Sequence, residues 1–95
     1  MTKTVWVFNG EHSRLPAGIF TTREAAEAWI RERGLSGTLS EFPVDVSAYD
    51  HALLEGLFTP KKPHEFTPAF MADFSPRLYH DHWRDGETDF DDPVE

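Results

Sequence analysis

The sequence predicts an α+β fold: a small sheet of three or four strands, in the order 2-1-3, packed against one main helix and a second short helix. Short β-branched and aromatic runs bounded by turn residues indicate the strands. A longer segment with apolar residues at helical spacing lies between the second and third of these runs. Aromatic residues make up 14% of the 95-residue chain, and each ring buries a large area in a small core.

Three strands are expected in the first 42 residues. Residues 4–8 (TVWVF) are almost wholly apolar and end at an Asn-Gly turn signal, which is typical of a central strand. Residues 17–20 should return antiparallel to them, and residues 38–42 should form the third strand. A strand–helix–strand crossover joins parallel strands, so strand three should run parallel to strand two, on the other side of strand one. Residues 79–86 (YHDHWRDG) are the candidate for a fourth strand.

The main helix is expected at residues 22–33. Thr21 and Glu24 have the spacing of a capping box, and Gly34 suits the left-handed position that follows a helix. Apolar side chains recur on one face of this segment, and the charged side chains of the other face should point to water. A shorter helix is expected from residue 48 to Gly56, preceded by a serine cap.

The chain changes character after the second helix. Residues 58–76 contain four of the seven prolines, so this segment should be extended, with at most one helical turn near residues 69–74. Its four phenylalanines indicate that it packs against the body of the protein, because disordered linkers are poor in aromatic residues. We therefore expect one domain at residues 1–86 and a disordered acidic tail at residues 87–95.

Composition limits the classes of partner. The net charge is −8, but residues 85–95 hold six of the 17 acids and no Lys or Arg, which leaves a body of net −2. A body without a basic stripe argues against nucleic-acid binding. No apolar run is long enough to cross a membrane, and no signal-type segment begins the sequence. The absence of cysteine excludes disulfides and is consistent with a cytoplasmic protein.

The ordered stretches VWVFNG, GIFTTREAAEAWI, LSG, PVD, YD and FTPKKPH resemble a family of small bacterial proteins that is known as a domain of unknown function. The resemblance covers about residues 4–86, and the PKKPH stretch is its most specific part. It implies a compact α+β fold in a bacterial or phage setting. It implies no activity and no catalytic residue.

The segment YHDHWRDG contains histidine and aspartate residues, which are common metal ligands. Strand alternation would place His80, His82 and Arg84 on one face, and two histidines at this spacing can chelate one metal ion. His64 or His51 would have to supply a third ligand, and Arg84 would lie unfavourably close to the cation. The sequence therefore favours a solvated strand face, with no cofactor and no bound metal.

The leading hypothesis is a small non-catalytic cytoplasmic domain that binds another protein, as an immunity-type or regulatory inhibitor would. Proline-stiffened lysines and neighbouring rings favour recognition, since prolines reduce the entropy lost on binding. The expected partner-binding residues are Phe58, Lys61, Lys62, His64, Phe66, His82 and Trp83. The alternatives are a metal-dependent enzyme that uses His64, His80 and His82, and a small-ligand sensor with a pocket between the sheet and the proline-rich segment.

Overall fold

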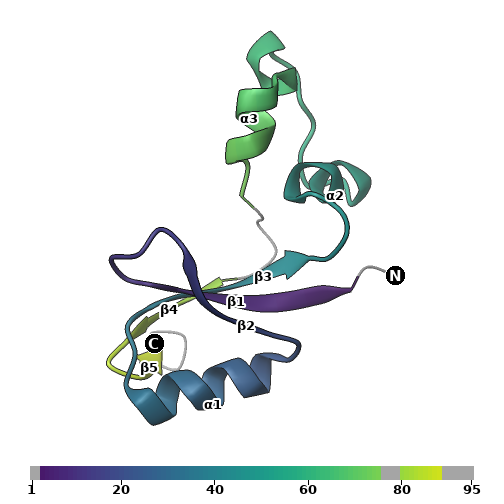
Figure 1. Cartoon of the computed structure of the whole chain (residues 1–95). Helices are drawn as coiled ribbons and strands as arrows, with labels where there is room; N and C mark the ends of the chain where they lie inside the picture. Colours follow the sequence, from purple (N-terminus) through teal and green to yellow (C-terminus); the bar gives the residue numbers. More distant parts are fainter. Residues whose placement is uncertain (1–2, 76–79, 89–95) are drawn as a thin grey trace, which may run out of the picture.

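The computed structural model describes residues 3–75 and 80–88, and its centre is one five-stranded antiparallel sheet (Figure 1). The strands lie in the order β2-β1-β3-β4-β5. Their bounds are β1 Thr4–Gly10, β2 Pro16–Phe20, β3 Gly37–Pro43, β4 His80–Arg84 and β5 Glu87–Thr88.

The expected order 2-1-3 is confirmed. Both β2 and β3 pair antiparallel with β1, so β2 and β3 run parallel to each other on opposite sides of β1. The expectation of three or four strands was too low, because β4 continues through a tight turn into β5. Glu87 and Thr88 therefore belong to the sheet, although the acidic tail was expected to begin at residue 87; residues 89–95, like Tyr79, lie outside the described part of the chain.

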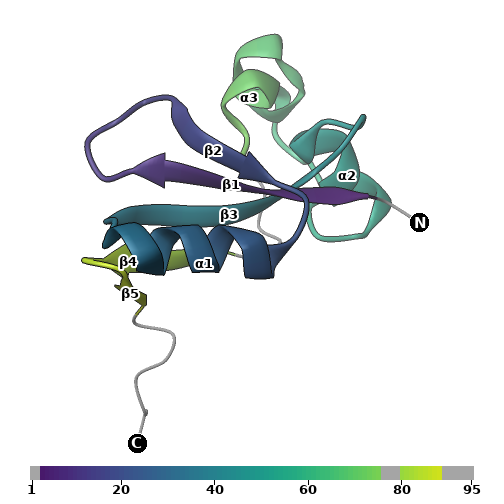
Figure 2. The same ribbon diagram turned by 60° about the horizontal axis from the view of Figure 1, so that its bottom comes forward.

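The helix α1 (Arg23–Arg33) lies across one face of the sheet (Figure 2). Its cap is Thr22, whose side-chain oxygen accepts a hydrogen bond from the Ala25 amide at 3.1 Å. The expected cap at Thr21 was wrong by one residue, because Thr22 is the last residue in an extended conformation. The helix ends as predicted at Gly34, which is left-handed, and the Leu35 amide returns to the Ile30 carbonyl.

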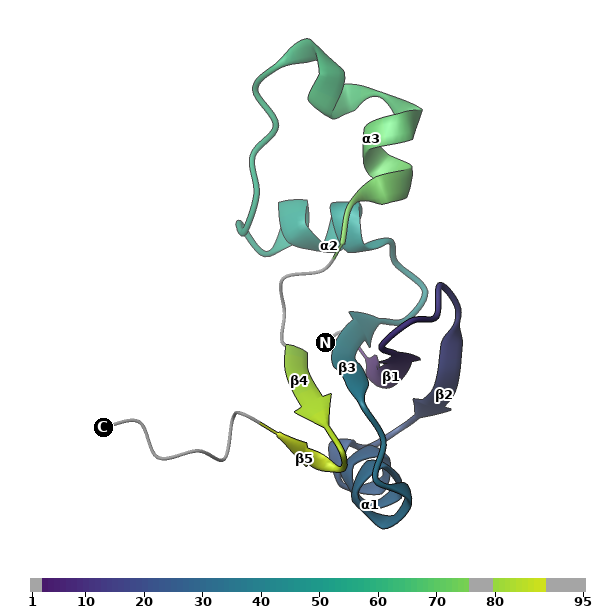
Figure 3. The same ribbon diagram turned by 90° about the vertical axis from the view of Figure 1, so that its left-hand side faces the viewer.

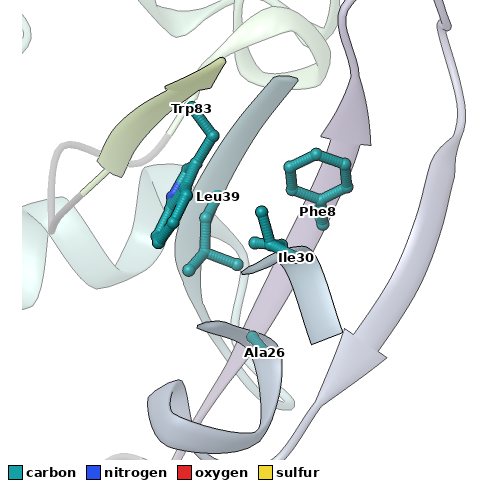
Figure 4. Close-up of a cluster of buried hydrophobic side chains, with 5 residues drawn as sticks. All are labelled: Phe8, Ala26, Ile30, Leu39 and Trp83. Atoms are coloured by element: carbon teal, nitrogen blue, oxygen red, sulfur yellow. The ribbon is translucent and has the colours of Figure 1, made fainter. Parts of the chain in front are cut away.

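The core forms where α1 meets the sheet (Figure 4). It consists of side chains that are at most 3% exposed, from three strands and the helix: Phe8, Ala26, Ile30, Leu39 and Trp83. Phe8 and Leu39 face each other across β1 and β3, and Ile30 lies over them. Strand alternation therefore directs one side of every central strand toward α1.

The sequence predicted that the polar side of α1 faces water, but charged side chains on this side also contact the sheet. The Arg23 guanidinium donates to Glu27 at 2.7 Å and to the carboxylate of Asp81 at 3.1 Å. The Asp81 side chain is 3% exposed, on the β4 face that points toward the helix. The guanidinium of Arg31 lies 5.0 Å from the centre of the Trp83 ring. These contacts join α1 to β4.

A second group of helices lies on the other side of the sheet from α1 (Figures 1 and 3). It comprises α2 (Ala48–Leu54), the short 3-10 helix η1 (Pro63–Phe66) and α3 (Pro68–Asp73). We call residues 47–75 the helical unit. The sequence had predicted at most one helical turn after α2, but prolines at the first positions of both η1 and α3 start two of them.

The helical unit is an insertion between two paired strands. β3 and β4 are hydrogen-bonded neighbours, with Ser40 opposite His80 and Gly37 opposite Trp83. The chain leaves the sheet at the end of β3, forms the helical unit, and returns to the same edge as β4 (Figure 3). None of the helices in the described part of the chain is long and apolar enough to span a bilayer.

Candidate functional site

The helical unit has its own aromatic cluster. The rings of Phe58, Phe70 and Phe74 lie with their centres 5.5–6.1 Å from that of Tyr49, which is buried on α2. The Tyr49 hydroxyl donates a 2.7 Å hydrogen bond to the carbonyl of Glu65. Three of the four phenylalanines of the proline-rich segment thus pack on α2, and these three are half-buried.

The lysine pair is held by its backbone. The carboxylate of Glu65 accepts hydrogen bonds from the amides of Lys61 and Lys62, at 2.7 and 3.0 Å. These two bonds, the first above all, lower the pKa of Glu65 below its ordinary value of 4.5. Both lysine side chains are exposed. Glu65 therefore fixes the loop that presents two cations to solvent, a role that the sequence had not indicated.

Exposed apolar side chains gather on the helical unit. The described residues include seven large apolar residues that are strongly exposed, and five of them belong to this unit: Leu53, Leu54, Leu57, Phe66 and Met71. Leu54 is 78% exposed and Phe66 is 56% exposed. The sheet contributes the other two, from the β1–β2 connection and from β2. Their concentration in one part of the chain makes this unit a candidate interaction surface.

The helical unit also contains a pocket of about 390 Å³. Apolar side chains from the end of α2 and from α3 line it, with one carboxylate and one hydroxyl: Ala52, Leu57, Phe58, Phe70, Asp73, Phe74 and Ser75. The pocket lies within the helical unit. The sequence had placed a ligand pocket between the sheet and the proline-rich segment, whereas the lining of this pocket comes from α2, from α3 and from the residues next to them.

The histidines of β4 lie on the exposed face of the sheet, as alternation predicted. His80 and His82 are exposed, and their ring centres are 5.2 Å apart. His64 belongs to η1, where its ring contacts Phe70 at 5.7 Å. Within residues 3–75 and 80–88, no three His, Asp or Glu side chains are grouped to hold a metal ion. The metal-dependent alternative therefore lacks a third ligand in this part of the chain.

Trp83 is not a surface residue. It was expected among the partner-binding residues, but its side chain is 3% exposed and belongs to the core beneath α1. Its neighbour His82 points the other way and lines a polar hollow of about 340 Å³ at the β1–β2 turn. There Arg84 lies 3.6 Å from Glu11.

The structure thus divides the seven expected partner-binding residues. Phe58, Lys61, Lys62, His64 and Phe66 all belong to the helical unit, whereas His82 and Trp83 lie on β4.

Sequence reasoning missed Leu54, Leu57 and Asp73. Leu54 is the last residue of α2 and Leu57 follows three residues later, and an apolar pair at a helix end was the available signal. Nothing in the sequence distinguished Asp73 from the other acids, because its place on the pocket depends on how α3 folds back toward α2.

These features define a small α+β protein with a helical unit inserted between two strands, and this unit carries five of the seven exposed large apolar residues in the described part of the chain. The chain belongs to the family described as "Domain of unknown function (DUF7710)", whose model matches residues 5–89. The expected membership of an uncharacterised family is confirmed. No curated protein and no solved structure matches the chain.

Proposed function

We propose that this chain is a non-catalytic protein-binding domain whose binding surface is the helical unit. The partner is a protein that presents apolar side chains beside an acidic patch. The proposed setting is the bacterial cytoplasm, and the proposed effect of binding is inhibition or regulation of the partner.

The exposed apolar side chains of the helical unit carry this proposal. Four large apolar residues within one stretch of the helical unit are each at least 41% exposed: Leu54, Leu57, Phe66 and Met71. Such residues add nothing to the folded state where they face water, and they supply binding energy when a partner removes them from water. The proline-rich backbone and the hydrogen bonds of Glu65 reduce the ordering needed on binding.

Charge supports an acidic partner. Lys61 and Lys62 are adjacent and exposed on a loop that is fixed by its backbone. Fixed exposed cations contribute little to stability, and they accelerate association with an oppositely charged surface.

The experiment compares capture of host proteins by the wild-type chain and by matched variants. Leu54→Glu alters the helical unit, and Leu15→Glu alters a residue of similar exposure, 73%, on the β1–β2 connection. A specific partner should be retained by Leu15→Glu and lost with Leu54→Glu. Lys61→Glu/Lys62→Glu should slow association, mostly at low salt, and Arg33→Glu, an exposed change on α1, should not.

Two outcomes would contradict the proposal. One is a partner that Leu15→Glu abolishes while Leu54→Glu leaves it intact, because the interface would then be on the sheet. The other is the absence of any captured protein that responds to the helical-unit changes. Inhibition is tested separately, by assaying the identified partner with and without the domain.

The pocket supports a second candidate, a small-ligand sensor. Its volume of about 390 Å³ falls within the range of ligand sites, roughly 300–1,000 Å³. The candidate would be supported by a small molecule that binds the helical unit and changes the affinity of the domain for its partner.

A further inference from the structure

The pocket of the helical unit has one apolar wall and one charged group. Three phenylalanine rings form the wall: Phe58 lies 5.8 Å from Phe70 and 5.1 Å from Phe74 between ring centres. Among the described residues, Asp73 is the one charged residue that lines the pocket, and Ser75 adds a hydroxyl. A ligand for this pocket needs an apolar body and a group that complements a carboxylate.

Asp73 lies at a position where the end of a helix disfavours a negative charge. It is the last residue of α3, where the free carbonyl groups already concentrate negative charge. An acid at a helix end of this kind is unfavourable for folding, and a cation there is favourable. No Lys or Arg within residues 3–75 and 80–88 forms an ion pair with Asp73. A cation beside the exposed Asp73 carboxylate is therefore favoured both by that carboxylate and by the end of α3.

The phenylalanine rings favour the same charge. The face of an aromatic ring is the negative part of its quadrupole, so a cation beside it is attracted, and desolvation strengthens the attraction. Aromatic walls combined with a carboxylate are suited to ammonium ions that carry apolar groups.

We propose that this pocket binds an organic ammonium ion attached to an aromatic or aliphatic body, as in an arylalkylamine. The apolar body contacts Phe58, Phe70 and Phe74, and the ammonium group pairs with Asp73. The ligand is a free small molecule, and its binding does not depend on the protein partner proposed above.

The experiment is an NMR titration of the purified domain with two probes of opposite charge. Phenethylamine and 3-phenylpropionate share a phenyl ring and a two-carbon chain, and they differ in the sign of the terminal group. The amine should shift amide signals of residues that line the pocket, saturably, and bind at least several-fold tighter than the carboxylate. Equal binding of both probes, or shifts confined to the sheet, would overturn the proposal.

Variants locate the charge and the rings. Asp73→Asn should weaken the binding of phenethylamine about threefold or more, which is the effect of one partly exposed ion pair. The same change should not weaken the binding of 3-phenylpropionate. Glu55→Gln is the control, an exposed acid of the same unit that does not line the pocket. Phe74→Leu keeps an apolar side chain and should weaken the amine through loss of the ring.

Equal amine binding by wild type and Asp73→Asn would overturn the assignment of the charged group. An unchanged pattern of amide dispersion in each variant shows that the fold is retained. Because no partner protein is present, failure of this titration leaves the protein-binding proposal standing, and failure of the capture experiment leaves this one standing.

Discussion

Gly86 lies directly against Gly34, so that a Cβ atom added to Gly86 would come within 2.9 Å of the Gly34 Cα atom. The Gly86 amide also donates a 2.9 Å hydrogen bond to the carbonyl of Leu35. Beside it, the Asp85 amide donates to the side-chain oxygen of Ser36 at 2.9 Å. The turn between β4 and β5 is therefore fastened to the end of α1 by a contact that requires glycine.

Gly86→Ala should destabilise the fold by about 2 kcal/mol or more, because its φ is +83° and the new methyl group meets backbone atoms. Urea denaturation followed by tryptophan fluorescence measures the loss. Gly56→Ala is the matched control: its φ is +71°, but the added Cβ would meet nothing within 4 Å. Equal losses in the two variants would mean that the Gly34–Gly86 contact has no energetic role.

Trp29→Ala should destabilise the protein by about 3 kcal/mol, the lower end of the range for aromatic truncation in a core. The Trp29 ring packs edge-on against Phe8 at 5.8 Å and lies 5.5 Å from Phe20. Glu32→Ala, an exposed change on α1, is the control and should stay within about 0.5 kcal/mol. A loss of less than about 1 kcal/mol for Trp29→Ala would show that this helix face contributes little to packing.

The loop of the lysine pair should loosen in acid. The pKa of Glu65 is lower in the folded chain than its ordinary 4.5, so this carboxylate favours folding above pH 4.5. That contribution should disappear as the pH falls below 4.5 and through the lower folded pKa. The amide signals of Lys61 and Lys62 should titrate with a midpoint below 4.5, and Glu65→Gln should abolish the titration. A midpoint at or above 4.5 would contradict the hydrogen-bonded geometry.

His80 and His82 should not bind zinc tightly. Two imidazoles on one strand face offer two ligands, whereas structural zinc sites use four. Calorimetric titration with zinc near neutral pH should therefore show no submicromolar site. Submicromolar binding that disappears in His80→Ala/His82→Ala would support the hypothesis of a metal-dependent enzyme. The site would then require ligands outside the described residues.

The sheet order and α1 could be predicted because their signals are local. The apolar run of β1, the helical spacing around Ile30 and the glycine after α1 each act within a few residues. The strand β5 was missed because two residues carry no periodicity, and its position depends on the fit of Gly86 against α1.

The candidate site was predictable in part. The composition of the proline-rich segment indicated that it is distinct from the rest of the chain, and five of the expected residues belong to the helical unit. Burial was not predictable in the same way: alternation separated Trp83 from His82, but the sequence did not say which face α1 would cover. The pocket depends on long-range packing of α3 near α2, which leaves no local signal.

Because β3 and β4 pair directly, with Ser40 opposite His80, the sheet itself holds together the two strands that the inserted segment connects. The entropy of closing a connection grows slowly with its length, so the ladder tolerates a long excursion almost as well as a short turn. The sheet and α1 form a framework, and the segment inserted between β3 and β4 can be replaced without disrupting it. The length and sequence of the segment between β3 and β4 can therefore change without altering the core that the sheet and α1 form.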